Sequence, residues 1–356
     1  MIAANTTYFK GRGAQFNPAN VYVKQQYTQD FPELIEEPLL QSIKTQVYFA
    51  EARNVVNKIK SPDLPFDYSI NPYQGCEHGC VYCYARNTHE YWGYSAGIEF
   101  EQKIIVKQNC IEQLEKKFNS KNWEVKPIML SGNTDCYQPL ERKHELTRGI
   151  LSLCLKYKHP VSIITKNALI LRDLDILKNL AKYNLVHVAI SITGLDEEIR
   201  WKMEPRSSTY SRRFETIQKL SAEGIPVSVM MAPIIPGINN HEIPEVIELA
   251  AKAGARDAGY SMVRLNGSVG PIFKDWLKQN FPDRATKVWN QICSTHGGNV
   301  NDSRFGVRMR GQGNLAESIQ QLFILSKTRF MRGVKKFEFD LTLFNHKPGD
   351  SQLSLF

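Results

Sequence analysis

The stretch that decides the fold reads Cys76-Glu77-His78-Gly79-Cys80-Val81-Tyr82-Cys83. Thiolates are preferred ligands of iron–sulfur clusters, zinc and copper(I), and a loop that curls can turn three nearby sulfurs onto one centre. A closed structural metal site normally has four protein ligands, whereas a catalytic site keeps one position open for a small molecule. The stretch therefore predicts a catalytic metal centre held by Cys76, Cys80 and Cys83.

The cysteine spacing, with Tyr82 as the aromatic residue before the last cysteine, resembles the cluster loop of the radical S-adenosylmethionine (SAM) superfamily. That resemblance implies a 4Fe-4S cluster whose fourth iron is chelated by SAM. A longer string resembles the bacterial branch grouped with spore photoproduct lyase-like enzymes, and it reads Ser69-Ile70-Asn71-Pro72-Tyr73-Gln74-Gly75-Cys76-Glu77-His78-Gly79-Cys80. The alternative is a zinc knuckle completed by His78 or His89.

Length and composition favour one α/β domain with appendages. The chain has 356 residues with 42% hydrophobic and 23% charged residues, and no Gly/Ser-rich or Pro-rich linker divides it. We find neither a signal-like N-terminus nor a long apolar run, so we expect a cytoplasmic protein that does not span a membrane. Four further cysteines are scattered and predict free thiols and no second cluster: Cys110, Cys136, Cys154 and Cys293.

From about residue 66, strands alternate with helices, as expected for a parallel sheet with crossover helices. The strands are predicted at 66–70, 127–130, 161–164, 186–192, 227–232 and 257–263. With the resemblance, this order predicts a partial (β/α)6 TIM-type barrel. We assign residues 1–65 to an irregular N-terminal extension, 66–270 to the core, 271–346 to a helical and basic addition, and 347–356 to a tail.

The loop after the second strand is the first candidate SAM contact. It reads Ser131-Gly132-Asn133-Thr134-Asp135, and its small polar groups can accept hydrogen bonds from an ammonium. By resemblance it occupies the place of the Gly-rich motif that holds the methionine amino group of SAM. The other interpretation is a strand-to-helix turn with Asp135 as a helix cap.

Later strand ends supply further candidate ligands. Lys166 can face the SAM carboxylate or a substrate anion, and Ser191 can reach the ribose hydroxyls. Glu204 and Arg206 resemble a Glu and Arg pattern of the branch, and Arg206 can bind a carboxylate or phosphate in bidentate fashion. Ile235 lies in a segment that resembles the one packing on adenine. For Lys166, Ser191, Glu204 and Arg206, an ion pair or hydrogen bond between loops is an equally good interpretation.

The resemblance implies that a reduced cluster cleaves SAM to methionine and a 5'-deoxyadenosyl radical, which removes hydrogen from the substrate. The electron would come from a donor such as flavodoxin or ferredoxin. Cys136 and Tyr137 are candidate catalytic residues, Tyr137 for radical relay or base stacking, while no hydrogen-donor role is carried over to Cys136. Cys136 follows the polar loop, whereas the hydrogen-donating cysteine of spore photoproduct lyase precedes it, so a buried thiol is the default interpretation.

The last residues, Gln352-Leu353-Ser354-Leu355-Phe356, resemble the bacterial sliding-clamp-binding pentapeptide. Gln352, Leu353, Leu355 and Phe356 are therefore candidate partner-binding residues, unless the apolar tail folds back on the barrel. The net charge of +9 favours a polyanionic partner, although for the charge by itself a solvated lysine-rich surface is the preferred interpretation.

Taken together, these patterns predict a radical SAM enzyme of the spore photoproduct lyase-like branch that acts on DNA and repairs a base lesion. The first alternative is a radical SAM enzyme whose substrate is RNA or a protein side chain. The second is a non-catalytic iron–sulfur or zinc protein that binds nucleic acid, for which no SAM cleavage is expected.

Overall fold

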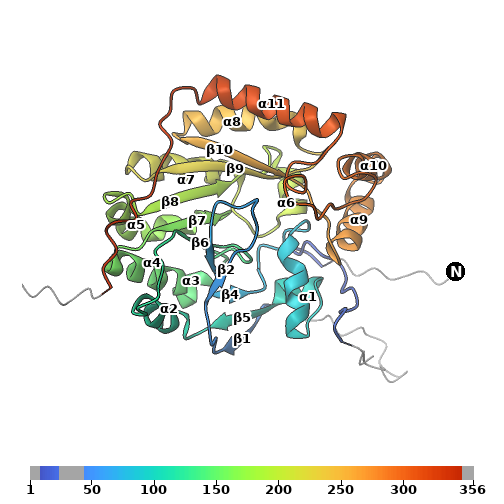
Figure 1. The fold of residues 1–356 in the computed structure, drawn as a ribbon. Helices are drawn as coiled ribbons and strands as arrows, with labels where there is room; N and C mark the ends of the chain where they lie inside the picture. Colours follow the sequence, from blue (N-terminus) through green and yellow to red (C-terminus); the bar gives the residue numbers. More distant parts are fainter. Residues whose placement is uncertain (1–8, 24–43, 347–356) are drawn as a thin grey trace, which may run out of the picture.

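The computed structural model describes residues 9–23 and 44–346 of the chain (Figure 1). Its main sheet has the order β10 (Asp257–Met262), β9 (Val227–Ile234), β8 (Val186–Ser191), β7 (Val161–Thr165), β6 (Ile128–Leu130), β3 (Tyr68–Ile70) and β2 (Val56–Lys58). From β3 to β10 neighbouring strands are parallel, whereas β2 is antiparallel to β3. Since β2 and β10 are not paired, the described sheet is open, and the predicted partial barrel of six parallel strands is confirmed.

Helices cover one side of this sheet (Figure 1). They are α2 (Cys110–Phe118), α4 (Leu146–Tyr157), α5 (Leu174–Ala181), α7 (Tyr210–Ala222) and α8 (Ile243–Lys252). The central strands are buried along almost their whole length, as expected where helices pack on one face and the barrel interior lies on the other. The core formed between sheet and helices fixes the carboxyl ends of the strands at one rim, where the candidate site lies.

A second, smaller sheet carries the chain into the cysteine loop. It has the order β1 (Gln46–Ala50), β5 (Lys103–Lys107) and β4 (Tyr73–Gln74). The two residues of β4 pair with the middle of β5 and directly precede Gly75 and Cys76. The 3-10 helix η1 (Tyr84–Trp92) and helix α1 (Ile98–Gln102) follow the loop, so the cysteines lie between two anchored segments.

The C-terminal addition is helical, as predicted, with α9 (Val269–Asn280), α10 (Ala285–Ser294) and α11 (Asn314–Phe330). Helix α11 lies along α8 (Figure 1). Among the described residues, no helix is both long and apolar enough to cross a bilayer.

Several elements differ from the sequence-based expectation. Between β6 and β7 the alternation predicts a single crossover helix, but the structure has two, α3 (Glu141–His144) and α4, because Glu145 has a φ of 51° and interrupts the helical hydrogen bonds. The short helix α6 (Glu197–Met203) was not predicted, although Asp196 caps it by accepting bonds from the backbone N–H groups of Glu198 and Ile199. Also unpredicted were the short turns of 3-10 helix η2 (Ala168–Asp173) and η3 (Asn240–Glu242).

Candidate active site

The cysteine loop follows β3 and β4 and is held by backbone hydrogen bonds from two directions. The N–H of Cys76 donates to the carbonyl of Phe100 (2.9 Å), and the N–H of Val81 donates to that of Met203 (3.1 Å). Cys76 and Cys80 are each 7% exposed, and Cys83 is partly exposed. Three reduced thiols are thus presented by one anchored loop at the carboxyl rim of the sheet.

The arrangement does not suit a zinc knuckle. Within residues 9–23 and 44–346, no three His, Cys, Asp or Glu side chains converge as ligands of a single ion. His78 is engaged at both ring nitrogens, because Nδ1 lies 3.3 Å from the carboxylate of Asp135 and Nε2 lies 3.3 Å from the amide nitrogen of Asn167. His89 packs between Tyr94 and Phe100, and burial lowers its pKa to about 4. In a cluster each thiolate binds a different iron, so three thiols on one loop, two of them buried, fit an iron–sulfur cluster.

Residues 9–23, which we call the N-terminal strap, pack directly on the cysteine loop. Buried Glu101 holds them, since its carboxylate accepts from the backbone N–H groups of Gly13 (3.0 Å) and Ala14 (2.9 Å) and pairs with buried Arg86 (2.5 Å). A methyl group at Gly13 would lie 1.8 Å from the carbonyl oxygen of Gly79. The strap therefore covers the loop. Residues 9–23 of the N-terminal extension thus pack against the core.

The predicted SAM loop is fixed chiefly through its backbone. Asn71 accepts hydrogen bonds from the N–H groups of Asn133 (2.7 Å) and Thr134 (3.3 Å), and the Tyr84 hydroxyl donates to the carbonyl of Gly132. Ser131 has a φ of 75° and accepts from the N–H of Cys136. The Thr134 hydroxyl is buried without a partner among the described residues, so it is a donor and acceptor that a ligand can satisfy.

Asp135, the last residue of this loop, is occupied by protein partners. One carboxylate oxygen accepts from the Thr165 hydroxyl (2.7 Å) and the Tyr137 N–H (2.9 Å); the other accepts from the Lys166 N–H (2.9 Å) and faces His78. Burial alone would raise the pKa of Asp135, but His78 and the hydrogen bonds lower it to about 2. Asp135 thus ties the cysteine loop to the ends of β6 and β7.

Lys166 follows β7 and reaches toward the cysteine loop. Its ammonium lies 5.7 Å from the centroid of the Tyr82 ring. Burial lowers the pKa of Lys166, but Cys80 and Glu204 raise it more, so the pKa lies above its usual value and the ammonium stays charged. Within the described part of the chain this ammonium forms no ion pair, which leaves it available to an anionic group of SAM or substrate.

Glu204 is fully buried and joins three segments. It accepts hydrogen bonds from the hydroxyls of Tyr82 and Thr193 (2.9 Å for Thr193) and pairs with the guanidinium of Arg213. Burial would raise the pKa of Glu204, but Arg213 and Lys166 lower it to about 2. The carboxylate therefore holds Tyr82, the aromatic residue of the cysteine loop, against the end of β8.

Arg213 was missed by the sequence analysis. It is fully buried in α7 and donates to the carbonyls of Ser208 and Ser191, both at 2.9 Å, as well as to Glu204. A signal was present, because an arginine stood at helical spacing among apolar residues that face the core: Tyr210, Ile217 and Leu220. Glu101 was missed as well, and its Glu99-Phe100-Glu101 context carries no comparable signal.

The other predicted contacts lie near the same rim. Arg206 pairs with Glu77 of the cysteine loop (3.3 Å), and its N–H donates to the carbonyl of His78 (3.3 Å). Ser191 is buried at the end of β8, where its carbonyl accepts from Arg213. Ile235 is buried in an apolar cluster that also contains Cys80 and Tyr82. Ligand roles for Arg206, Ser191 and Ile235 stay predictions.

Cys136 and Tyr137 lie in the hydrophobic core and are fully buried. Burial raises the pKa of the Cys136 thiol well above its usual value, and the Tyr137 hydroxyl donates to Asp173 (3.0 Å). This placement agrees with the buried-thiol interpretation, and a catalytic role for either residue stays a prediction. The candidate clamp-binding residues, Gln352, Leu353, Leu355 and Phe356, lie outside the described residues.

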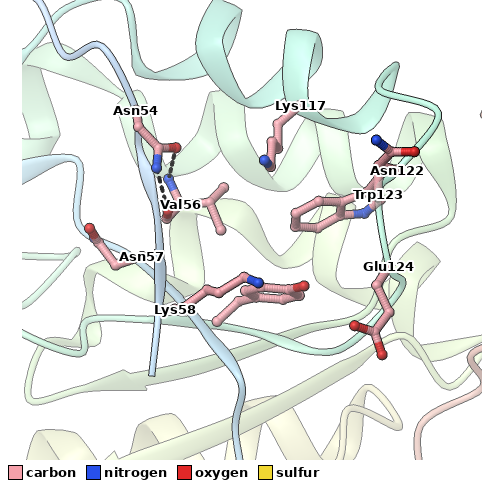
Figure 2. Close-up of a pocket in the computed structure, with 9 residues that line it drawn as sticks. Asn54, Val56, Asn57, Lys58, Lys117, Asn122, Trp123 and Glu124 are labelled. Carbon is pink, nitrogen blue, oxygen red and sulfur yellow. Dashed lines mark hydrogen bonds between the residues drawn. The ribbon is translucent and has the colours of Figure 1, made fainter. Parts of the chain in front are cut away.

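A pocket of about 480 Å³ opens at the other end of the barrel (Figure 2). It is lined by Val56, Lys58, Tyr68, Lys117 and Trp123, among others. Tyr68 begins β3, whereas the cysteine loop follows the end of that strand. This pocket is therefore separate from the candidate active site.

The sequence over residues 70–250, just over half of the chain, matches the family model of the radical SAM superfamily. The chain belongs to the radical SAM superfamily. It is 32% identical over 238 residues to an uncharacterized protein of Mycobacterium tuberculosis, an overlap of 66% of this chain and 70% of the relative. It is 25% identical over 225 residues to the radical SAM Nalpha-GlyT isomerase of Pseudomonas phage M6, covering 62% of this chain and 44% of that protein.

Among solved structures, the fold is similar to a spore photoproduct lyase mutant with bound AdoMet and dinucleoside spore photoproduct. The TM-score is 0.56 at 16% sequence identity, over 83% of this chain and 82% of that one. The cofactors of this radical SAM enzyme are accordingly a 4Fe-4S cluster and SAM, and Cys76, Cys80 and Cys83 are the residues that would hold the cluster.

Proposed function

We propose that this enzyme acts on DNA and repairs a base lesion. The observation that carries this proposal is the extent of its likeness to spore photoproduct lyase, which covers 83% of the chain and reaches beyond the 181 residues of the matched family model. The flanking segments of a radical SAM enzyme shape access to its site, so a shared arrangement outside the core supports a similar kind of substrate.

The residues around the site support this role because they hold the cysteine loop in position. The cluster and SAM, when bound, supply a hydrogen-abstracting radical. Glu204 and Asp135 hold Tyr82 and His78 of the cysteine loop in place, while the strap packs over the loop. The Lys166 ammonium lies where it can neutralise a carboxylate of SAM or an anion of the substrate.

Charge and the tail support a DNA partner. A net charge of +9 favours phosphate contacts. If residues 352–356 bind a bacterial sliding clamp, tethering would raise the effective concentration of the enzyme at DNA. We further propose a one-electron donor of the flavodoxin or ferredoxin type.

The test is SAM cleavage to 5'-deoxyadenosine by the anaerobically reconstituted, reduced protein, with and without UV-irradiated DNA. We expect irradiated DNA to stimulate cleavage more than undamaged DNA of the same sequence, and Cys80→Ala to abolish it. The matched control is Cys154→Ala, a buried cysteine on α4 away from the loop. Cleavage that is indifferent to DNA would contradict the DNA proposal and direct the search to RNA or protein substrates.

A second candidate is a radical rearrangement instead of bond cleavage, because one relative is named an isomerase. Digestion of the treated DNA to nucleosides, followed by chromatography and mass analysis, distinguishes them. A lyase separates two joined neighbouring bases, so digestion releases two unmodified mononucleosides, whereas an isomerase leaves a joined dinucleotide of unchanged mass with a different retention time.

A further inference from the structure

The open side of the barrel is spanned by residues 304–310, which we call the bridge segment. At one edge, the N–H of Met262 in β10 donates to the carbonyl of Met309 (2.9 Å). At the other, Asp63 in the turn between β2 and β3 accepts from the N–H of Gly306 (2.7 Å) and pairs with Arg308 (2.5 Å). The bridge segment therefore links the two unpaired edges and frames the open side of the barrel.

Arg264 lies inside this frame. Its two neighbours, Val263 and Leu265, are buried in the apolar cluster that contains Cys80 and Tyr82. Val263 continues the pairing beyond β10, because its N–H donates to the carbonyl of Ile234 (2.9 Å). In an extended segment, successive side chains point to opposite faces. The side chain of Arg264 therefore points away from that cluster, toward the bridge segment, where Nη1 lies 3.7 Å from the sulfur of Met309.

The guanidinium of Arg264 is poorly satisfied for a partly buried cation. Its Nε is buried without a hydrogen-bond partner, and no carboxylate within residues 9–23 and 44–346 pairs with it. Arg308, in contrast, forms an ion pair with Asp63. A desolvated cation without a partner is costly, and an arginine fork matches the oxygens of a phosphate or carboxylate. An anionic ligand would supply the missing acceptors.

Arg264 lies close to the cysteine loop and to exposed aromatic rings. Arg264 and Tyr84 are close enough to interact electrostatically, and Tyr84 directly follows Cys83 and binds the carbonyl of Gly132. Tyr84 is 52% exposed, and Phe305 of the bridge segment is 56% exposed with the Arg308 guanidinium 4.4 Å from its ring centroid. Exposed rings beside a cation are the components of a surface that stacks bases and neutralises phosphate.

We propose that Arg264 binds a backbone phosphate of the substrate strand at the open side of the barrel framed by the bridge segment, next to the lesion presented to the cysteine loop. The inference rests on the proposed function and adds a residue that the cysteine, SAM and clamp motifs do not include. The exposed rings of Tyr84 and Phe305 favour a nucleic acid over an acidic peptide, since a peptide carboxylate needs no stacking surface.

The experiment compares two UV-irradiated thymine-rich oligonucleotides, one with phosphodiester linkages and one with uncharged methylphosphonate linkages. Dissociation constants are measured by fluorescence anisotropy on the anaerobically reconstituted protein, after iron content has shown that each variant is loaded. We expect the wild type to prefer the charged strand by about tenfold or more, as for a bidentate charged contact. Arg264→Gln should lose most of that preference, and Arg264→Lys should keep part of it.

The matched control is Arg212→Gln, which removes the same charge from an exposed arginine on α7 that pairs with Glu215. An equal loss of preference in Arg212→Gln and Arg264→Gln would overturn the proposal, because general charge would then explain the binding. An unchanged preference in Arg264→Gln would overturn it as well.

Failure of the DNA function itself has a different signature, namely a wild type that binds neither irradiated strand. In that case thermal unfolding with inorganic pyrophosphate tests the anion site directly. Stabilisation of the wild type and not of Arg264→Gln would support an anion site for another substrate. Equal behaviour of both proteins would overturn the site altogether.

Discussion

At the scale of single residues, the candidate site depends on buried charges that hold the cysteine loop. Glu204 and Arg213 are both fully buried, and each has further hydrogen bonds to neighbouring segments. A buried pair of this kind contributes little when compared with apolar residues, but removing one partner leaves an uncompensated charge.

We therefore expect Arg213→Met to lower the free energy of unfolding by about 3–5 kcal/mol. The double variant Arg213→Met with Glu204→Gln should lose less than the sum of the single losses, because neither charge is then left alone. Urea denaturation of the cluster-free protein provides the measurement. As a control, Lys178→Gln breaks a surface pair with Glu223 and should cost less than about 1 kcal/mol. Additive losses in the double variant would show that the pair does not act as a unit.

The sequence predicted the residues of the cysteine loop better than those that support it. Spacing identified Cys76, Cys80 and Cys83, because thiols on one short loop must lie near one another. Asp135 and Arg206 were placed at the correct rim, but their partners, His78 and Glu77, come from a segment far away in the sequence. No local pattern encodes such a pairing, which depends on how two strand ends meet.

At the scale of elements, the N-terminal strap is the part of the structure that sequence reasoning left most open. An irregular N-terminal extension was expected, and residues 9–23 form no helix or strand, but what the strap contacts depends on Glu101, 88 residues after Gly13. The strands and crossover helices were easier to predict from the sequence, because each shows its own apolar periodicity. Helix α6 and the split between α3 and α4 were missed, since short segments give too few periods to recognise.

The strap leads to a prediction about Gly13→Ala. The added methyl group would lie 1.8 Å from a backbone oxygen of Gly79, so the strap must lift from the cysteine loop. We expect thiols of the loop in the cluster-free protein to react with a thiol reagent about tenfold faster, since Cys80 is 7% exposed while the strap is in place. Stopped-flow labelling followed by peptide mapping measures this.

The control for this prediction is Ala19→Ser, a change at an exposed position of the same strap. It should leave the labelling rate unchanged. If Gly13→Ala labels no faster than Ala19→Ser, the strap does not restrict access to the loop.

At the scale of the whole molecule, the open sheet has two edge strands, each without a neighbouring strand on one side. Edge strands expose unpaired backbone groups, and proteins commonly cover or shorten them. Here β2 has three residues, and the bridge segment satisfies the Met262 N–H next to the other edge. Part of the basic charge of the 271–346 addition therefore has a structural role, because Arg308 is paired with Asp63.

This linkage predicts the behaviour of Asp63→Ala. Without the carboxylate, the Gly306 N–H and the Arg308 guanidinium lose their acceptor, and the bridge segment detaches from the turn between β2 and β3. We expect backbone hydrogen exchange in residues 304–310 to accelerate by about tenfold or more, while exchange in β7 and β8 stays unchanged, because local opening costs less than global unfolding. Asp302→Ala removes the same charge from a carboxylate that pairs only within its own neighbourhood, with Arg304, and should accelerate exchange much less. Equal acceleration in both variants would mean that the segment is held by local turns and not by the far edge of the barrel, and the open side of the barrel would then have no fixed frame.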